Sequence, residues 1–323
     1  MILILSVDWD ISTDKIEDWL IYHKANYLRV NTNSLPVDVA EANLFDGVFE
    51  FTNGLRLVSK EIDLVYFRKW FPNNYITKIP ELSEAKNPEI IQHLKTENAE
   101  FSSYFINSFK NAKWIDNYIY ASVNKLDQLI AAKDCGINVP GTVLTRKKEN
   151  LKKFIDVNTK VISKPIISTI LYPYNGSYFS TYAELITPEF FHLLPEEFQL
   201  SLFQEYIDKK FEIRSVYVDG DFYSLAYFSQ QDELTSVDFK KGTPGVNFKT
   251  EVMVLPVAIE AKLTLLMKKL HLLTGSFDLV YTKNKEFVFL EVNPCGILDN
   301  VSHLGNFNIE EKMAKMLMKY DRN

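Results

Sequence analysis

The sequence predicts an α/β protein built from several lobes. At the N-terminus, an apolar strand over residues 2–7 is followed by a helix over 13–24, capped by its first residue, and then by a second strand over 27–30. A strand–helix–strand order with short connections implies two parallel strands covered by the helix. Two later stretches, 211–228 and 277–292, have the alternation and turn residues of hairpins, which predict antiparallel sheets. A chain of 323 residues is long enough for two or three such lobes.

Composition and short motifs exclude several classes of protein. A net charge of −6 argues against a general nucleic-acid binder, and the two cysteines, Cys135 and Cys295, form no CxxC and suit a reducing cytoplasm. The apolar start of the chain meets Asp8 too early for a signal peptide or a membrane span. The five histidines match no zinc spacing, and the chain lacks the Walker A, GxGxxG and GxSxG motifs. We therefore expect a cytoplasmic protein without nucleic-acid or membrane partners, in which any nucleotide site is built in another way.

The strongest candidate site lies in the second predicted hairpin. Asp278 falls near the start of its first strand, and Glu291 and Asn293 fall near the end of its second strand. Residues two apart on a strand leave the same face, and pairing across the turn brings Asp278 alongside them. Oxygen ligands without His or Cys suit Mg²⁺. The strands are otherwise strongly apolar, so these polar ends favour a metal site over a solvated hairpin.

This hairpin resembles the metal-binding end of the ATP-grasp ligases, because an Asp precedes a strand that carries Leu-Glu-Val-Asn-Pro over 290–294. Members of that family join a carboxylate to a nucleophile through an acyl phosphate, using ATP and Mg²⁺. The resemblance implies an ATP-grasp fold with an N-terminal lobe over 1–113, a central lobe over 114–200 and a C-terminal lobe over 201–323. It assigns Mg²⁺ to the carboxylates of Asp278 and Glu291 and to the amide of Asn293.

Two lysines match the phosphate-binding positions of that family. Lys125 lies at the start of a predicted helix that Gly136 ends, and Lys164 ends a strand directly before Pro165. A lone lysine at a helix start is usually exposed to solvent, and only the resemblance implies that these two contact the phosphates. The loop over 166–178, which would cover the phosphates, has one glycine where many relatives have several.

A second set of residues matches the family's adenine and ribose contacts. The resemblance implies that the backbone and side chains of one short segment bind adenine: Gln204, Glu205, Tyr206 and Ile207. One of the next two lysines, Lys209 or Lys210, matches a further family lysine; the sequence does not choose between them, and we take Lys210 as the candidate.

Glu212 and Arg214 share one face of the following strand. From the residue types alone, these side chains are interpreted as members of a cross-strand ion pair. With the resemblance, Glu212 binds the ribose, and Arg214 binds the γ-phosphate and the carboxylate being activated, a role that suits a guanidinium fork.

The stretch over 178–231 resembles one branch of the family, the graspetide macrocyclases that make microviridins and related peptides. It contains Ile-Thr-Pro, Phe-Gln-Glu-Tyr-Ile, Glu-Ile-Arg and Phe-Ser-Gln in that order. The branch also has a strand that ends in aromatic-Arg-x-Trp, and Arg68 matches the Arg of that motif. Arg68 would lie at the carboxyl end of a strand, where open α/β sheets bind ligands. The Asp-aromatic-Arg segment of the branch is Asp238-Phe239-Lys240 here, so a point charge replaces a guanidinium fork. The candidate catalytic residues are Arg214, Arg68, Asp238 and Lys240.

The resemblance implies an enzyme that activates Glu or Asp side chains of a ribosomally made precursor peptide and closes ester or amide crosslinks within it. The peptide would consist of a leader, which docks on the central lobe, and a core rich in Thr, Ser, Glu and Asp. Family analogy also implies a homodimer. Two alternatives stay open: a ligase that adds an amino acid such as glutamate in trans, and a non-catalytic module that binds ATP or peptide.

Overall fold

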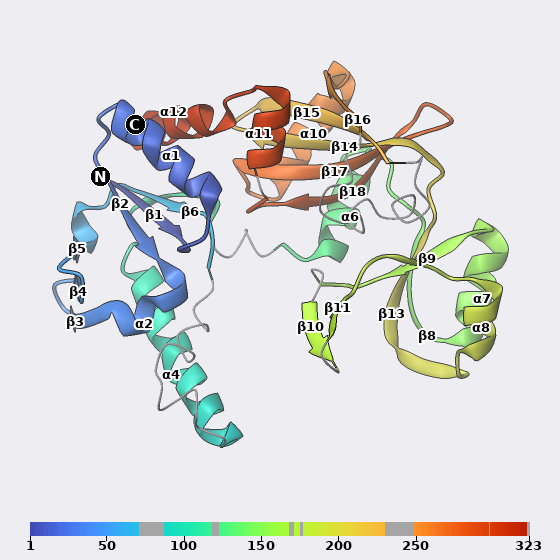
Figure 1. Ribbon diagram of the computed structural model, residues 1–323, viewed down its shortest axis with the longest axis horizontal. Helices are drawn as coiled ribbons and strands as arrows, with labels where there is room; N and C mark the ends of the chain where they lie inside the picture. The colour runs from blue at the N-terminus through green and yellow to red at the C-terminus, as the bar shows by residue number, and fades with distance from the viewer. Residues whose placement is uncertain are drawn as a thin grey trace. The chain divides into compact units, whose positions relative to one another are not determined.

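The computed structural model describes residues 1–70, 87–117, 123–167, 171–174, 177–229, 249–296 and 298–321 (Figure 1). The chain forms two compact units. Unit 1 comprises residues 1–122, 271–274 and 294–323, and unit 2 comprises residues 123–270 and 275–293. The division into three lobes stays a prediction.

Unit 1 is organised around a parallel sheet of four strands in the order β2-β1-β6-β7. Every neighbouring pair in it is parallel. This confirms the strand–helix–strand unit predicted at the N-terminus. The elements are β1 (Ile2–Ser6), α1 (Ile11–Tyr22), β2 (Tyr27–Asn31), β6 (Leu64–Phe67) and β7 (Lys113–Ile115).

The start of α1 differs from the prediction. Asp10, rather than Thr13, is the N-terminal cap residue, and Thr13 lies within the first turn. The Thr13 hydroxyl donates a hydrogen bond to the Asp10 carboxylate at 2.6 Å. Asp10 is buried, and a buried carboxylate needs hydrogen bonds or a cation to offset its lost hydration, so we expect it to pair with a buried cation.

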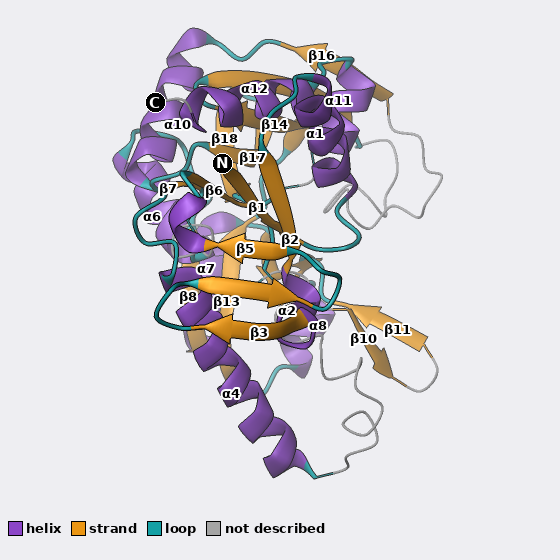
Figure 2. Cartoon of the chain, turned by 90° about the vertical axis from the view of Figure 1, so that its left-hand side faces the viewer, coloured by secondary structure: helices purple, strands orange, loops and turns teal. Residues whose placement is uncertain are grey.

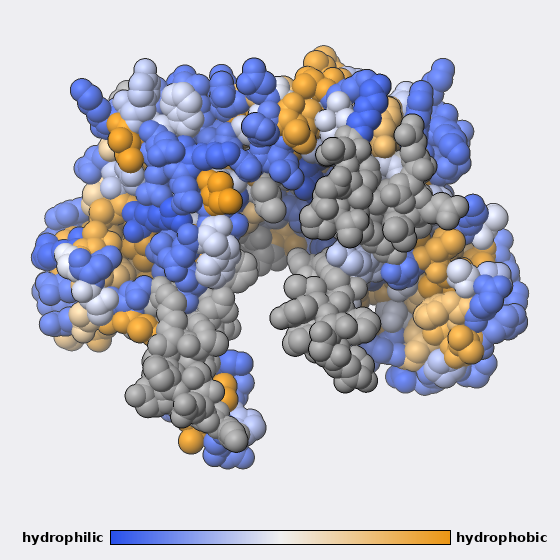
Figure 3. Space-filling model, in the orientation of Figure 1, coloured by the Kyte–Doolittle hydropathy of each residue, from blue (hydrophilic) through white to orange (hydrophobic). Residues whose placement is uncertain are grey.

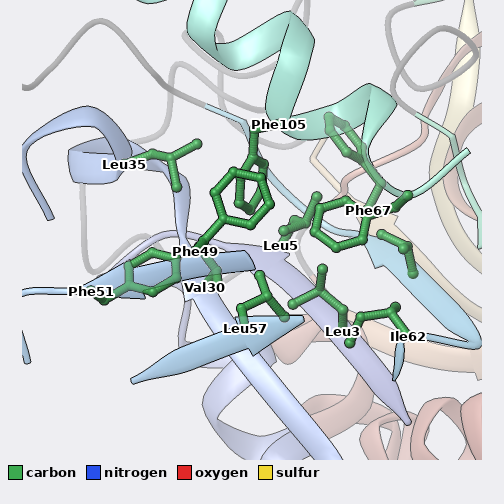
Figure 4. Close-up of a cluster of buried hydrophobic side chains, with 12 residues drawn as sticks. Leu3, Leu5, Val30, Leu35, Phe49, Phe51, Leu57, Ile62, Phe67 and Phe105 are labelled. Carbon is green, nitrogen blue, oxygen red and sulfur yellow. The ribbon is translucent and has the colours of Figure 1, made fainter. Parts of the chain in front are cut away.

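Unit 1 has its main apolar core beside the parallel sheet (Figure 4). Leu5 and Phe67 of the sheet meet Phe49 of a small antiparallel sheet and Phe105 of a long helix. These further elements, visible in Figure 2, are β3 (Val39–Asn43), β4 (Val48–Phe51), β5 (Arg56–Val58) and α4 (Pro88–Asn107). Two short helices, α2 (Leu35–Asp38) and α11 (Asp299–Gly305), complete the unit together with α12 (Ile309–Asp321), which packs on α1 and contacts β1 and β6. None of the helices in the described ranges, α4 included, is long and apolar enough to cross a membrane.

Unit 2 contains two larger sheets and a two-stranded sheet of β10 (Leu171–Tyr174) and β11 (Ser177–Ser180). The first is antiparallel, in the order β12-β9-β13-β8, and α7 packs on it through Leu151, Val161 and Phe203. Its elements are β8 (Thr142–Lys147), α7 (Lys148–Asn158), β9 (Val161–Lys164), β12 (Glu184–Leu185), α8 (Pro188–Leu193) and β13 (Glu197–Glu205). The sequence over 178–186 predicts one strand, but the structure divides it, because β11 pairs with β10 and β12 pairs with β9.

The second sheet of unit 2 has the order β16-β15-β14-β17-β18. Its strands are β14 (Lys209–Val218), β15 (Asp221–Phe228), β16 (Lys249–Met253), β17 (Thr274–Thr282) and β18 (Phe287–Asn293), accompanied by α6 (Lys125–Asp134) and α10 (Val257–Lys269). Asp219 and Gly220 form the predicted turn between β14 and β15, both with positive φ. The apolar pattern over 256–274 predicts a helix that Gly275 ends, but α10 ends at Lys269 and Gly275 lies within β17.

A buried carboxylate in unit 1 predicts a pH-dependent contribution to stability. Asp116 accepts hydrogen bonds from the backbone N–H groups of Leu273 (2.8 Å) and Thr274 (3.2 Å) and from the Thr274 hydroxyl. Burial outweighs these bonds and raises its pKa from 3.8 to about 6. The folded protein therefore binds a proton that the unfolded chain binds only at lower pH. The stabilisation is complete below the ordinary pKa and is lost as the pH rises through 6.

We expect Asp116→Asn to remove this pH dependence. The free energy of unfolding of the wild type, taken relative to that of Asp116→Asn, should fall by on the order of 3 kcal/mol between about pH 4 and about pH 7. This follows because each pKa unit corresponds to about 1.4 kcal/mol. Urea unfolding of both proteins across this range measures the difference. Parallel curves would show that Asp116 does not titrate as described.

Candidate active site

The three predicted metal ligands come together at one end of β17 and β18. Asp278 lies directly opposite Glu291, and Ser276 lies opposite Asn293. Both carboxylates are buried, each with 6% of its surface exposed. The Asn293 amide nitrogen lies 3.5 Å from a Glu291 carboxylate oxygen, so all three side chains share one face. The hairpin geometry is as predicted, and the metal role of these residues stays a prediction.

A β-bulge lies beside these ligands. Asp278 pairs with Glu291, but the next residue, Leu279, pairs with Phe289, so Leu290 is an extra residue on β18. Bulges bend a strand and re-aim its side chains, and they are frequent next to functional sites. Here the bulge directly precedes Glu291 and sets the direction of its side chain.

Two cations neutralise the two carboxylates. Lys125, the first residue of α6, places its ammonium 2.8 Å from Glu291. Arg214 on β14 binds Asp278 through two nitrogens, with Nε at 3.0 Å and a terminal nitrogen at 3.3 Å. Burial lowers the pKa of Arg214, but the charge and hydrogen bonds of Asp278, together with the charge of Glu291 and the nearby Tyr227, outweigh burial and raise the pKa. The site thus combines two anionic and two cationic side chains.

The donor set fits a magnesium ion. Two carboxylates and one amide oxygen on a common face are hard ligands of the kind that Mg²⁺ takes, together with water and phosphate oxygens. No group of three or more His, Cys, Asp or Glu side chains is arranged for a metal within the described ranges, so the candidate set depends on Asn293 as its third member. Lys125 and Arg214 are the residue types that bind phosphate oxygens.

Glu212 lies in a second polar cluster on the same sheet. It is buried, and its carboxylate accepts hydrogen bonds from the Lys209 ammonium and from the Ser229 hydroxyl, the latter at 3.1 Å. Lys209 is buried at 5% exposure, whereas Lys210 is exposed. The structure therefore brings Lys209 rather than Lys210 to Glu212, although strict alternation of faces along a strand would place Lys210 on the side of Glu212.

The predicted adenine segment joins the two sheets of unit 2. Its side chains already have partners there: the Gln204 amide donates to the Thr142 hydroxyl at 3.0 Å, and Glu205 accepts from the Gly141 N–H at 3.1 Å. The backbone N–H groups of Glu205 and Tyr206 are bound to carbonyl oxygens of Gly141 and Lys160. Ile207 is therefore the residue of this segment whose N–H suits an added ligand.

A cavity of about 920 Å³ opens beside this segment. It is lined by one side of α6 along most of its length, by residues 137–142 and 205–208, and by the hairpin end between β17 and β18. Lys164, at the half-buried end of β9, lines another cavity of about 990 Å³ in the same unit. Part of the predicted phosphate loop (168–170 and 175–176) lies outside the described residues.

Arg68 lies in unit 1 and is buried, with 2% of its surface exposed. It pairs with Asp10 at 3.1 Å and donates to the Gly296 carbonyl at 2.9 Å. Trp70 stacks on Phe67 instead. Arg68 is therefore not a surface residue stacked on Trp70, the alternative that the residues alone allow, and its catalytic role stays a prediction.

Cys295 and the segment of Asp238 and Lys240 remain to be placed. Cys295 packs against the apolar core of unit 1, and burial raises its pKa to about 11, so it is a weak nucleophile at neutral pH. This agrees with a packing role. Asp238 and Lys240 lie outside the described residues, and their roles stay predictions.

Sequence reasoning missed two polar residues around the site, Ser229 and Gln128, and named Lys209 only as the alternative to Lys210. Ser229 and Lys209 are the partners of Glu212, and Gln128 accepts a hydrogen bond from the backbone N–H of Val292 on the metal-site strand at 2.9 Å. Gln128 lies three residues after Lys125 on α6, and this spacing places both on neighbouring positions of one helix face. That spacing is a signal that the sequence already contained.

The structure matches solved structures over almost its whole length. A RiPP-associated ATP-grasp ligase from Chryseobacterium gregarium, solved in complex with ADP and a leader and core peptide, has a TM-score of 0.84 and 23% identity over 98% of this chain and 96% of that one. The macrocyclase MdnC from Microcystis aeruginosa, bound with precursor peptide MdnA, has a TM-score of 0.82 and 23% identity over 98% and 99% of the two chains. The macrocyclase MdnB from the same organism has a TM-score of 0.75 and 24% identity over 98% of each chain.

These similarities define the fold. The chain has the ATP-grasp fold, as its sequence motifs predicted. No protein-family model matches the sequence, and no curated protein matches it either.

Proposed function

We propose that this protein is an ATP-dependent ligase that closes crosslinks within a ribosomally made peptide. The observation that carries the proposal is the pairing of Asp278 with Glu291 across a hairpin, each bound to a cation suited to phosphate, in an ATP-grasp fold. The similar Chryseobacterium structure contains ADP and a leader and core peptide, and the similar MdnC structure contains the precursor peptide MdnA. They support a peptide substrate and ATP as the phosphoryl donor.

In this proposal Asp278, Glu291 and Asn293 hold Mg²⁺, which when bound offsets negative charge on the phosphates. Lys125 and Lys164 bind phosphate oxygens. Glu212, oriented by Lys209 and Ser229, accepts from the ribose hydroxyls, and the N–H of Ile207 donates to the adenine edge. Because these groups are fixed by neighbours before ligand binding, they contribute mainly by positioning and electrostatics.

The proposed reaction has two steps. A Glu or Asp side chain of the peptide attacks the γ-phosphorus of ATP, which forms an acyl phosphate and releases ADP. A Ser or Thr hydroxyl, or a Lys amine, of the same peptide then attacks the acyl carbon. An ester or amide bond forms, the bond to the phosphate oxygen breaks, and the nucleophile's proton leaves with hydrogen phosphate. Arg214 offsets charge on the transferring group and orients the carboxylate, with Asp238, Lys240 and Arg68 as further candidates.

We also propose that the leader part of the peptide docks on the central lobe. Apolar side chains around the cavity near Lys164 are partly exposed, including Ile167 (60%), Phe190 (49%) and Leu200 (50%). Figure 3 shows apolar surface over this part of unit 2. By analogy with the graspetide macrocyclases, we also propose that the core peptide is rich in Thr, Ser, Glu and Asp. By the same analogy, we propose a homodimer and a cytoplasmic location.

Intact-mass measurement tests the proposed function. The full chain is incubated with ATP, Mg²⁺ and a candidate precursor peptide encoded by a neighbouring short reading frame. Loss of one water mass for each bond formed, dependent on ATP, is the expected result. A gain of one residue's mass when glutamate is present would instead support ligation in trans. No mass change and no ADP release with a peptide that binds would contradict both enzyme functions and leave a binding module.

A further inference from the structure

The metal-site strand β18 lies at the edge of its sheet, with β17 on one side. Its other edge is bonded to α6 and to the segment that follows this helix. The N–H of Phe289 donates to the carbonyl of Asn138 at 2.8 Å, and the N–H of Val292 donates to the side-chain oxygen of Gln128 at 2.9 Å. The second of these bonds is made by a side chain and not by another strand.

The spacing of these two bonds follows from the bulge. In a regular strand, N–H groups that point to one edge recur at every second residue. Phe289 and Val292 are three apart because Leu290 is an extra residue. A bulge leaves the ladder locally disrupted, so the backbone there needs other partners to stay fixed. Asn138 and Gln128 supply them on either side of Glu291.

Gln128 is itself held in one place. It is buried, with 2% of its surface exposed, and its amide nitrogen donates to the Val123 carbonyl at 3.3 Å. Lys125 of the same helix binds the Glu291 carboxylate. α6 thus contacts the strand twice, through a charge at Glu291 and through a neutral hydrogen bond at the next residue.

We infer that Gln128 is a positioning residue for the metal ligands: by fixing the Val292 N–H, it holds the backbone between Glu291 and Asn293. This inference rests on the proposed function, since it assigns Gln128 to the metal site of that function. A neutral bond to the backbone does not compete with a cation for the carboxylates, so it persists when Mg²⁺ occupies the site, whereas the Lys125–Glu291 contact competes directly with the metal.

Binding of Mn²⁺ to the full chain in the presence of ADP, followed by electron paramagnetic resonance, tests the inference. Gln128→Met keeps the side-chain length but removes the acceptor. We expect about 10- to 100-fold weaker Mn²⁺ binding, the range found when groups that orient metal ligands are removed, and a modestly lower melting temperature, because the buried Val292 N–H loses its acceptor. ADP affinity without metal should be unchanged. Gln128→Glu retains an acceptor oxygen and should bind Mn²⁺ more tightly than Gln128→Met.

Ser224→Ala is the matched control, because it removes a buried hydrogen bond to Ser215 in the same sheet, on the face opposite Arg214. It should leave Mn²⁺ binding unchanged. Wild-type binding by a folded Gln128→Met variant would overturn the inference and leave the proposed function standing. If that variant does not fold, Gln128→Glu decides: Mn²⁺ binding close to wild type supports the inference, and a tenfold loss overturns it. Failure of the wild type to bind Mn²⁺ with ADP would refute the proposed metal site itself.

Discussion

Replacing Glu291 with glutamine is expected to lower peptide-dependent ADP release by on the order of a hundred- to a thousandfold, or about 3–4 kcal/mol of transition-state stabilisation. The amide has nearly the same shape as the carboxylate but lacks its charge, so it binds Mg²⁺ poorly. Lys125 loses its partner at the same time, but this lysine is 21% exposed and water can solvate it. The fold should therefore persist, with little change in melting temperature.

The control for this variant is Glu310→Gln. Glu310 is also a buried carboxylate with a hydrogen-bonded neighbour, the Ser302 hydroxyl, but it lies on α12 in unit 1. It should retain wild-type ADP release and product mass. Equal activity of Glu291→Gln and wild type would remove Glu291 from the metal site and, with it, the main support for the proposed chemistry.

The site hairpin was predictable from the sequence because its determinants are local. The alternation of apolar residues over 277–292 and the polar turn define two paired strands, and their register follows from the turn. Asp278 and Glu291 were therefore expected to lie side by side, and they do. The bulge at Leu290 was not predictable, because one extra residue in an apolar run changes neither composition nor turn signal.

Contacts between distant segments could not be derived from periodicity. Arg214 and Asp278 are 64 residues apart, and only the order of strands in the sheet brings them together. Spacing along β14 would place Lys210 on the face of Glu212, yet Lys209 makes the contact, so the choice between the two lysines could not be read from the sequence. Gln128 was overlooked because a single Gln on a helix has many equivalent explanations.

The end of α10 shows why one glycine was misinterpreted. Apolar residues continue past Lys269, so the sequence predicted a helix as far as Thr274, closed by Gly275. The helix instead ends at Lys269, and His271 adopts a positive φ of 56°. A Cβ on Gly275 would approach side-chain carbons of Met267 and Val292 to 3.1 Å. Glycine thus lets the side chains of Met267 and Val292 pack closely against β17, which the sequence pattern does not reveal.

Replacing Arg214 with lysine is expected to lower kcat by on the order of a hundredfold, or about 2.7 kcal/mol, with a much smaller effect on the KM for ATP. Arg214 contacts Asp278 with two nitrogens of one planar group, and such a fork can hold two oxygens in a fixed plane. A lysine keeps the positive charge but presents it as a point, so orientation of the peptide carboxylate and γ-phosphate is lost. Steady-state ADP release at varied ATP and peptide concentrations separates kcat from KM.

Arg214→Ala and Arg29→Lys distinguish catalysis from structure. Alanine leaves the buried Asp278 carboxylate without its guanidinium and should destabilise the protein by about 3 kcal/mol, whereas lysine should not. Arg29 is likewise an ion-paired arginine, bound to Asp14 and Glu17 on unit 1, and its lysine variant should retain full activity. If Arg214→Lys turned over at the wild-type rate, the fork geometry would be unnecessary, and Arg214 would be the electrostatic partner of Asp278 alone. If Arg214→Lys instead keeps wild-type stability but loses turnover, the guanidinium acts on the reacting groups, because the charge of the lysine alone is then enough to pair with Asp278.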